Sequence, residues 1–269
     1  MTRRTFLKVL AGAGVAAISV DAFAIEPNRL EITKHNVTMP KLPGELNGLK
    51  IVQLSDLHRS SIVPDDLIRS AVKMTNDLSP DIVVLTGDFV SNTSENARPC
   101  AEMLSELRTR IGTYAVLGNH DHWAGRETVI ARLKDHGIMT LVNQNIEPAP
   151  GLVLLGLDDY WVGAPNFTKT WKGADPSAAQ IFLSHNPFAV SKMNSKDCLM
   201  LSGHTHGGQA IISFIPIGSL PALRRWKYIK GWYNVGNTRL YVNRGIGMIN
   251  PPIRFMCSPE ITQFTLFSH

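Results

Sequence analysis

Gly203-His204-Thr205-His206 is the stretch whose residue types point most directly to chemistry. It follows the apolar run Cys198 to Leu201, which indicates a buried strand. Two imidazoles separated by one residue, on a tight turn after such a strand, can face neighbouring metal ions. Two nearby histidines also occur by chance or as a satisfied pair in a core. The motif alone therefore leaves a metal site and a structural pair open.

Three further polar clusters follow apolar runs in the same way. Residues 49–54, 81–85 and 113–117 are short, β-branched and almost continuously apolar, which is typical of buried parallel strands. Open α/β sheets place their sites at the carboxyl ends of strands. A single Asp there is usually a turn or helix-cap residue, but several clusters together favour one shared site. The clusters are Asp56-Leu57-His58, Gly87-Asp88 and Gly118-Asn119-His120-Asp121.

One more histidine, His185, follows the apolar run 181–184 and extends the set of candidate metal ligands. The set supplies only nitrogen and oxygen donors, which favours Mn²⁺, Fe²⁺ or Zn²⁺ over copper(I) or an iron–sulfur cluster. Seven donors exceed one tetrahedral site, so we expect two ions about 3.5–4 Å apart that share a carboxylate. Such a pair clamps the attacking and leaving oxygens of a phosphoryl displacement. The candidates are Asp56, His58, Asp88, Asn119, His185, His204 and His206.

The order of these motifs resembles that of the calcineurin-like metallophosphoesterases over residues 49–208. The shared order is Asp-x-His, Gly-Asp, Gly-Asn-His-Asp, a single His and Gly-His-x-His. The resemblance implies that the first ion is held by Asp56, His58 and His206. It implies that the second ion is held by Asn119, His185 and His204, and that Asp88 bridges the two.

The resemblance also implies the catalytic groups. His120 would protonate the leaving oxygen or steady the transferring phosphoryl group, and Asp121 would orient His120. A metal-bound hydroxide would be the nucleophile, because two cations lower the pKa of bound water, so no Ser or Cys nucleophile is needed. His122 is expected to be structural or to support the site from behind.

Two features narrow the branch of the family. Phosphoprotein phosphatases of this superfamily carry an Asp-Arg pair after Gly-Asp, whereas here Gly87-Asp88 continues with Phe89, which disfavours a protein phosphatase. Residues 203–209, with 243–247 downstream, resemble the exported bacterial phosphodiesterases related to enzymes of the UDP-2,3-diacylglucosamine hydrolase type. In that context Arg244 either contacts a substrate phosphate or is a buried structural arginine.

The N-terminus has the pattern of a signal peptide. A basic region at Thr2 to Lys8 precedes a modest apolar segment, Val9 to Val20, and a small-residue cleavage site at Ala22 to Ala24. The apolar segment has roughly a dozen residues, fewer than the ~20 that a spanning helix needs. Arg3-Arg4 with Phe6-Leu7-Lys8 resembles the twin-arginine export signal. We therefore expect residues 1–24 to be a twin-arginine-type signal peptide, the alternative being a basic N-terminus before a helix.

Charge then excludes one class of function. Removing residues 1–24 leaves 24 basic and 21 acidic residues, so the formal net charge falls from +5 to +3. We expect no nucleic-acid binding from so small an excess, although Arg224, Arg225, Lys227 and Lys230 form a local basic cluster. That cluster is either a solvated loop or a contact for an anionic surface.

The remaining chain, residues 25–269, is expected to be a single metallophosphoesterase domain of the α/β class. Alternating strands and helices up to Leu141 predict a largely parallel sheet, and more strands follow. We expect a four-layer αββα sandwich, with two mixed sheets flanked by helices and the metal site at strand carboxyl ends. Helices are predicted at 64–78, 101–110 and 126–136, and strands outside the motifs at 30–37 (an edge strand), 152–157, 181–184, 198–202, 239–243 and 261–266.

Residues 214–233 lack clean periodicity and are predicted to be a loop beside the site. Their aromatic and basic side chains either hold an amphipathic phosphate ester or a lipid surface, or pack on each other. They are Phe214, Arg224, Arg225, Trp226, Tyr228 and Trp232. Three cysteines give no disulfide framework; Cys100 and Cys257 could pair after export, but no feature indicates it.

The leading hypothesis is a phosphodiesterase or pyrophosphatase that depends on two divalent metal ions and acts on a small-molecule or lipid-linked phosphate ester of the cell envelope. The twin-arginine machinery would export it to the periplasm or the envelope. One alternative is hydrolysis of the pyrophosphate of UDP-2,3-diacylglucosamine, which export disfavours because such nucleotide sugars are made on the cytoplasmic side. Another is a non-catalytic, metal-loaded envelope-binding protein, which the intact His120 disfavours.

Overall fold

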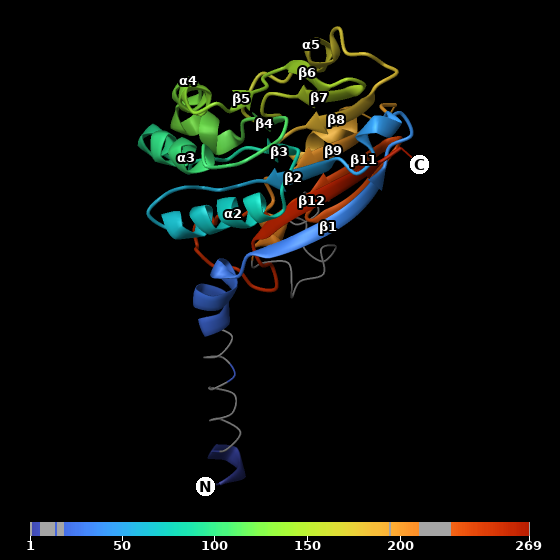
Figure 1. Ribbon diagram of the computed structural model, residues 1–269. Helices are drawn as coiled ribbons and strands as arrows, with labels where there is room; N and C mark the ends of the chain where they lie inside the picture. The colour runs from blue at the N-terminus through green and yellow to red at the C-terminus, as the bar shows by residue number, and fades with distance from the viewer. Residues whose placement is uncertain (1, 6–13, 15–18, 194, 210–226, 269) are drawn as a thin grey trace.

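The computed structural model describes residues 2–5, 14, 19–193, 195–209 and 227–268. Two six-stranded sheets pack face to face in it, and helices cover their outer faces (Figure 1). This arrangement confirms the predicted four-layer αββα sandwich. It brings the carboxyl ends of strands from both sheets to one edge of the molecule, where the candidate ligands lie.

The first sheet contains the strands that carry the upstream motifs. Its middle strands run parallel from β2 to β5, whereas β12 runs antiparallel to β2 and parallel to β1. β1 is an edge strand, as predicted. In spatial order the strands are β1 (Glu31–Thr38), β12 (Glu260–Phe267), β2 (Lys50–Leu54), β3 (Ile82–Leu85), β4 (Gly112–Ala115) and β5 (Met139–Thr140).

The second sheet carries the two downstream motifs. Its four central strands are parallel, and the two edge strands run antiparallel to their neighbours. His185 follows one central strand and the Gly-His-x-His turn follows the next. In spatial order the strands are β10 (Gly231–Val235), β11 (Thr238–Val242), β9 (Cys198–Ser202), β8 (Ala179–Leu183), β7 (Leu152–Gly156) and β6 (Gln144–Ala149).

The central strands are apolar along their whole length because both of their faces are covered. In β2, Ile51 points into the core between the sheets, while Val52 and Leu54 point to the helices outside. In β8, Ile181 faces the inter-sheet core and Phe182 faces the opposite layer. The strand period of two thus distributes one apolar run over two cores.

Among the described residues, four α-helices make the outer layers. α2 (Asp65–Asp77), α3 (Ala97–Leu104) and α4 (Asn119–Asp135) cover the first sheet, and their buried side chains share a core with β2 and β3. The short α5 (Phe167–Trp171) covers the second sheet, where Trp171 stacks on Phe182 with ring centroids 4.8 Å apart. The prediction for α2 is confirmed, with Pro64 as its N-cap.

Two helix predictions have wrong bounds. The helix predicted at 101–110 is α3, which ends at Leu104, because the following segment is tied to α2. The Asn76 side chain donates to the Glu106 carbonyl and accepts from the Arg108 amide. The helix predicted at 126–136 begins at Asn119, inside the motif, and Gly125 interrupts it at φ 124°.

Three strands were not predicted. β5 has only two residues, and the edge strands β6 and β10 are only partly buried, so none of them carries a continuous apolar run. β10 also corrects the prediction that residues 214–233 are a loop, because Trp232 and Tyr233 belong to this strand. The predicted aromatic and basic side chains of Phe214, Arg224, Arg225 and Trp226 lie outside the described residues.

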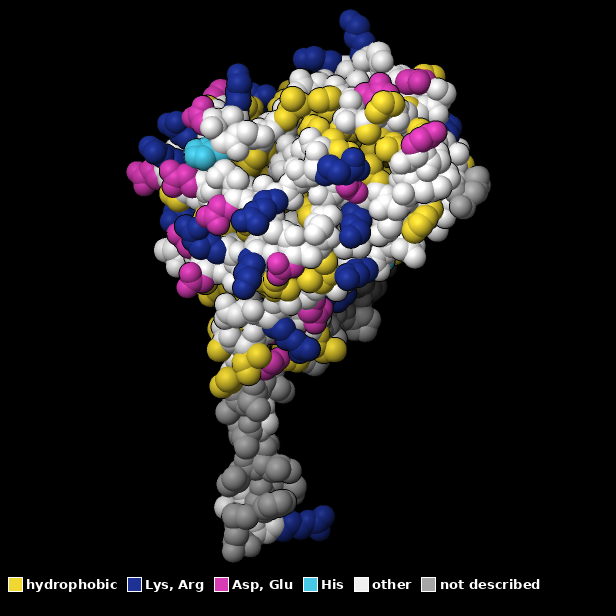
Figure 2. Space-filling model, in the orientation of Figure 1, with side chains coloured by type: hydrophobic (Ala, Val, Ile, Leu, Met, Phe, Trp, Pro, Cys, Tyr) yellow, Lys and Arg dark blue, Asp and Glu magenta, His cyan; other side chains and the backbone are white. Residues whose placement is uncertain are grey.

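Parts of that aromatic and basic set can be placed. Tyr228 is buried in the outer core of the second sheet, and Lys227 lies over its ring. Lys230 donates to the Met256 carbonyl, and Trp232 packs on Tyr241. On the face of the molecule in Figure 2, Lys and Arg are interspersed with Asp and Glu, so their fields partly cancel at a distance.

The segment around the predicted signal boundary is docked on the domain. Ala22 is buried and its carbonyl accepts from the Arg254 amide, while the Glu26 carboxylate accepts from the amides of Met256 and Cys257. The boundary predicted after Ala24 thus falls inside a docked stretch. Among the described residues, no helix combines the length and the apolar character that crossing a bilayer requires.

The three cysteines are free and buried. Cys100 donates to the Phe89 carbonyl and Cys257 donates to the His206 carbonyl. The pairing of Cys100 with Cys257 that was considered from the sequence is therefore not formed.

Candidate metal centre

The seven candidate ligands follow the carboxyl ends of strands, in loops or at the start of a helix, and most of them have unusual backbone angles. Five adopt positive φ, between 48° and 74°, although none is glycine. The left-handed region costs a residue with a side chain free energy, and such residues gather at functional sites because the surrounding structure holds them there. The five are Asp56, His58, Asp88, His204 and His206.

Two motif glycines let the loops meet. A Cβ atom on Gly118 would overlap the Asp88 carboxylate, and one on Gly203 would overlap the side chains of Ser55 and Asp56. Only glycine permits this approach of backbone to carboxylate. The glycines of Gly-Asn-His and Gly-His-x-His therefore serve to close the site, which explains their place directly before the ligands.

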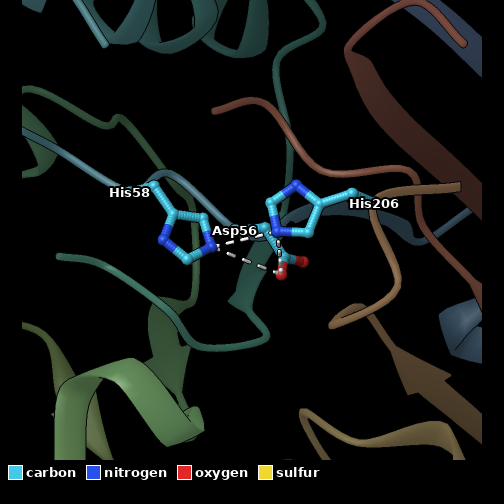
Figure 3. A group of neighbouring side chains, drawn as sticks. All are labelled: Asp56, His58 and His206. Atoms are coloured by element: carbon cyan, nitrogen blue, oxygen red, sulfur yellow. Dashed lines mark hydrogen bonds and ion pairs between the residues drawn. The ribbon is translucent and has the colours of Figure 1, made fainter. Parts of the chain in front are cut away.

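The first group of ligand atoms joins the two sheets. Asp56 and His58 follow β2, His206 follows β9, and one ligand atom from each lies within 4.8 Å of the others (Figure 3). The Nε2 atoms of His58 and His206 are 3.0 Å apart, and His206 Nε2 is 3.4 Å from Asp56 Oδ1. All three side chains are buried.

The second group is assembled from four strand ends. Asp88, His185 and His204 each place one ligand atom within 4.8 Å of the others. His185 Nε2 lies 3.2 Å from Asp88 Oδ2, 3.1 Å from His204 Nδ1 and 3.2 Å from Asn119 Oδ1. The same Asp88 oxygen is 3.3 Å from His58 Nε2 of the first group. Asp88 is therefore the carboxylate common to both groups.

These separations fit two bound cations. Nitrogen and oxygen ligands about 2.0–2.1 Å from one divalent ion lie roughly 3.0–3.4 Å from each other. Six of the separations between ligand atoms run from 3.0 to 3.4 Å, and His58 Nε2 lies 3.9 Å from Asp56 Oδ1. The His and Asp clusters thus suit a dinuclear metal site. Which ligand holds which ion, and which metal is bound, stay predictions.

The electrostatics of the site also suit cations. Burial raises the pKa of Asp56, because an unneutralised carboxylate is costly in a dry interior. Burial would also raise the pKa of Asp88, but the charges and hydrogen bonds of His185 and His58 together outweigh burial and hold that pKa well below its usual range. Burial lowers the pKa of His185, but the charge and hydrogen bond of Asp88, together with the charge of Asp56, outweigh burial. The pKa of His185 is therefore well above its usual range. A divalent ion between the two would replace the proton on His185.

His204 and His206 are held neutral, which is the form that binds metal. Burial and the neighbouring charge of His185 lower the pKa of His204 to about 3. Burial and the nearby His58 hold the pKa of His206 well below its usual range. These imidazoles keep a lone pair free for an ion at neutral pH.

His120 lies beside both groups without belonging to the ligand set expected from the sequence. One of its nitrogens lies within 4.8 Å of ligand atoms of His58 and Asp88. His120 Nδ1 is 2.6 Å from the Ser91 carbonyl oxygen, which can only accept, so Nδ1 carries a proton. Its backbone amide donates to Asp88 Oδ1 at 2.9 Å. Burial lowers the pKa of His120, although Asp88 opposes this.

The expectation that Asp121 orients His120 is wrong. The Asp121 carboxylate instead accepts from the backbone amides of Asp88, Phe89 and Gly118 at 2.8–2.9 Å. It therefore stabilises the turn that presents Asp88. The Ser91 carbonyl, which no sequence motif marks, takes the place next to the His120 imidazole.

Arg244 lies in a structural network. Its guanidinium donates to Glu260 Oε2 at 3.2 Å and to Glu31 Oε2 at 3.1 Å, so two carboxylates offset its charge. Of the two alternatives from the sequence, these contacts favour the structural arginine. Contact with a substrate phosphate is not supported by this geometry.

Sequence reasoning missed Arg254, which is fully buried behind the site. It donates to the carbonyls of Arg244, Gly245 and Gly247, and the last two glycines pack against Asp56 and Leu57. No motif or strand end marks this position in the sequence. His122, left open from the sequence, pairs with Asp158 at 2.8 Å.

The chain resembles known proteins in family, in sequence and in fold. The family model described as calcineurin-like phosphoesterase matches residues 49–208. The chain is 35% identical to the uncharacterized metallophosphoesterase YkuE of Bacillus subtilis, over 100% of this chain and 98% of that one. It is 32% identical to the phosphodiesterase YaeI of Escherichia coli, over 99% of each chain.

Two further matches are more limited. A Danio rerio transmembrane protein with a metallophosphoesterase domain is 30% identical over 98% of this chain, which spans 63% of that protein. The crystal structure of TT1561 of Thermus thermophilus shares the fold, with a TM-score of 0.51 at 14% identity over 74% of this chain and 91% of that one. The family match and the two full-length bacterial relatives agree with the site geometry: this chain belongs to the calcineurin-like phosphoesterase family and is a metal-dependent phosphoester hydrolase.

Proposed function

We propose that this protein is a phosphodiesterase that acts on a phosphate ester of the cell envelope. The single observation that carries the proposal is the Asp88 carboxylate, which lies between two groups of ligand atoms with His120 directly beside it. Two divalent ions in these groups would supply charge to the phosphoryl oxygens and an ionised water as nucleophile. The chain's own residues do the rest.

His120 is the group placed to handle the proton of the leaving oxygen. Its Nδ1–H donates to the Ser91 carbonyl, so the ring is held in one orientation and Nε2 is left for the substrate. When protonated, Nε2 can donate to the oxygen of the departing alcohol. The lowered pKa of His120 makes it a ready proton donor, because a weaker base gives up its proton more easily.

A diester is favoured over a phosphoprotein by the residues after Asp88. The chain continues Phe89-Val90-Ser91 in place of the Asp-Arg pair of protein phosphatases, and the Phe89 and Val90 side chains are buried in the core. The relative from Escherichia coli carries the name phosphodiesterase. Export through the twin-arginine pathway, from the Arg3-Arg4 motif, remains part of the proposal and places the substrate in the periplasm or the envelope.

The catalytic proposal is tested with purified, Mn²⁺-loaded protein. We expect faster hydrolysis of bis(p-nitrophenyl) phosphate than of p-nitrophenyl phosphate, and loss of both activities after chelation. Faster hydrolysis of the monoester would contradict a diesterase. Two bound Mn²⁺ ions without hydrolysis of either compound would favour the metal-loaded binding protein instead.

The export proposal is tested separately. Residues 1–30 are fused to a folded reporter, and the matched control replaces Arg3 and Arg4 by Lys, which keeps the charge. We expect the reporter outside the cytoplasm for the native pair and inside it for the Lys pair. Retention of both fusions in the cytoplasm would remove the export claim.

A further inference from the structure

We propose that Trp123 and Trp161 form an apolar subsite, here called the tryptophan wall, that binds an organic group carried by the leaving oxygen of the substrate. The inference rests on the proposed function and names the substrate class more closely: a phosphate ester whose departing alcohol is apolar.

The tryptophan wall lies against both ends of the metal centre. The Trp123 ring packs edge-on against His120 with centroids 4.8 Å apart, and the Trp161 ring packs edge-on against His204 at 5.6 Å. The two tryptophans meet each other at 6.5 Å. Together they connect the candidate proton donor to a ligand of the second group.

Both rings are largely open to solvent in spite of these contacts. Trp123 is 56% exposed and Trp161 is 65% exposed, and the adjacent Val162 is 36% exposed. Tryptophans that serve only the core are buried, whereas neighbouring exposed rings leave apolar area for a ligand to cover. The wall is therefore a surface ready for an apolar group next to the phosphate position.

A rigid frame holds the wall in place. Trp161 lies in the loop after β7, where its amide and that of Val162 donate to Asp159 Oδ1 at 2.9 and 2.8 Å. The adjacent Asp158 accepts from the Ala164 amide and pairs with His122, one residue before Trp123. The loop of one tryptophan is thus cross-linked to the helix of the other. Two exposed rings fixed in this way lose little conformational freedom on binding.

The chemistry of the wall selects the departing group. Indole rings bind alkyl chains through area burial and planar rings through stacking, whereas a small hydrated group such as glycerol offers little apolar area to cover. Because His120 donates to the leaving oxygen and Trp123 contacts His120, the group on that oxygen is the one that lies on the wall. We expect an aryl or long alkyl alcohol to leave and a polar alcohol to be bound weakly there.

The test uses binding of phosphonates, which are not hydrolysed at the phosphorus–carbon bond. Affinities of Mn²⁺-loaded protein for methyl-, hexyl- and phenylphosphonate are measured by calorimetry. We expect hexyl- or phenylphosphonate to bind about tenfold more tightly than methylphosphonate. A stronger effect of the hexyl group indicates a long alkyl substituent, and a stronger effect of the phenyl group indicates a planar ring.

Three single variants complete the test. Trp161→Ala and Trp123→Ala should each remove most of that preference and leave methylphosphonate affinity and Mn²⁺ stoichiometry unchanged. The matched control is Trp232→Ala, because Trp232 is also 40% exposed but packs on His35 and Tyr241, and it should keep the preference. The high exposure of Trp161 means that its replacement leaves the fold intact.

The outcomes separate this inference from the proposed function. Equal affinity of the native protein for methyl-, hexyl- and phenylphosphonate, absence of binding of both hexyl- and phenylphosphonate, or a preference that survives both Trp123→Ala and Trp161→Ala overturns the tryptophan wall. Failure to hydrolyse bis(p-nitrophenyl) phosphate overturns the diesterase and leaves the phosphonate comparison valid, because that comparison measures binding alone.

Discussion

The side chains of Asp56, His58 and His206 are buried, whereas Trp123 and Trp161, at the rim of the same centre, are more than half exposed. The ligands extend from strand ends that two cores hold from both sides. The tryptophans extend from a helix start and a loop that polar contacts hold. The contrast separates two tasks: the buried part holds charge in fixed geometry, and the exposed part offers area to a substrate.

Removal of the shared carboxylate should have the largest effect, because it acts on both groups at once. In Asp88→Asn we expect kcat/KM for a phosphodiester to fall by about 10³-fold, with fewer than two Mn²⁺ bound per chain. Steady-state kinetics and metal analysis check this. Asp77→Asn, at the exposed end of α2, is the control. Two tightly bound ions in Asp88→Asn would contradict the bridging role.

His120→Ala tests the residue that lies between the buried ligands and the exposed tryptophans. We expect kcat to fall by roughly 10²–10³-fold while both ions stay bound, because His120 handles a proton. His136→Ala, which removes a histidine at the end of α4, should leave kcat unchanged. A kcat near that of the native protein in His120→Ala would show that the proton is handled elsewhere.

Asp121→Ala tests whether the buried part depends on its backbone frame. The change leaves the amides of Asp88, Phe89 and Gly118 without their acceptor, so we expect a loss of roughly 3 kcal/mol in the free energy of unfolding. Chemical denaturation measures it. His120→Ala should lose far less stability. Equal losses would mean that the two neighbours share one role.

Glu260→Gln tests how much the buried Glu260 carboxylate contributes to the free energy of unfolding, and how that contribution depends on pH. Burial raises the pKa of Glu260, but Arg244 and the hydroxyls of Thr33 and Tyr241 outweigh it and hold that pKa below its usual range. The stabilisation is therefore present at neutral pH and is lost as the pH falls below the usual range of a glutamate and through the lowered folded-state pKa. We expect the variant to lose roughly 2 kcal/mol at pH 7.

Denaturation of native and Glu260→Gln protein at several pH values checks that sign. The difference between the two proteins should shrink as the pH falls through the lowered folded-state pKa of Glu260. A difference that grows on acidification would mean that the Glu260 pKa is raised in the folded protein.

His122→Ala should have the smallest effect, because it loosens only the exposed part. Loss of the pair with Asp158 frees the loop of Trp161, and we expect KM for an apolar diester to rise about threefold with kcat unchanged. An unchanged KM would mean that the Asp159 contacts hold Trp161 by themselves. A fall in kcat would mean that His122 acts on His120.

The fold was predictable where apolar patterns are strong. Continuous runs marked β2, β3, β7, β8 and β9 because these strands are covered on both faces. The edge strands β6 and β10 were not predicted, because they are only partly buried and carry no continuous apolar run. The predicted bounds of α3 were wrong because the Asn76 side chain, from another helix, forms hydrogen bonds with the backbone after Leu104. Long-range contacts of that kind leave no local pattern.

The candidate site was also predictable only in part. Polar residues directly after strands identified every candidate ligand, and the family resemblance supplied their grouping. Asp121 was given the wrong partner because it is adjacent to His120 at the start of α4, and adjacent residues on a helix point in different directions. Trp123 and Trp161 were missed because they are 38 positions apart in the sequence and meet only when the loop after β7 reaches α4.

The sequence by itself determined the ligand types, their order along the chain and their place after strands, because burial of a strand and the polarity of its end are local properties. Only the tertiary structure decided that His58 after β2 and His206 after β9, from different sheets, bring their Nε2 atoms within 3.0 Å of each other. It also decided that the Ser91 carbonyl, and not Asp121, contacts the His120 imidazole. It also decided that two exposed tryptophans close the rim. Those contacts depend on how two sheets pack, and packing is set by the whole core.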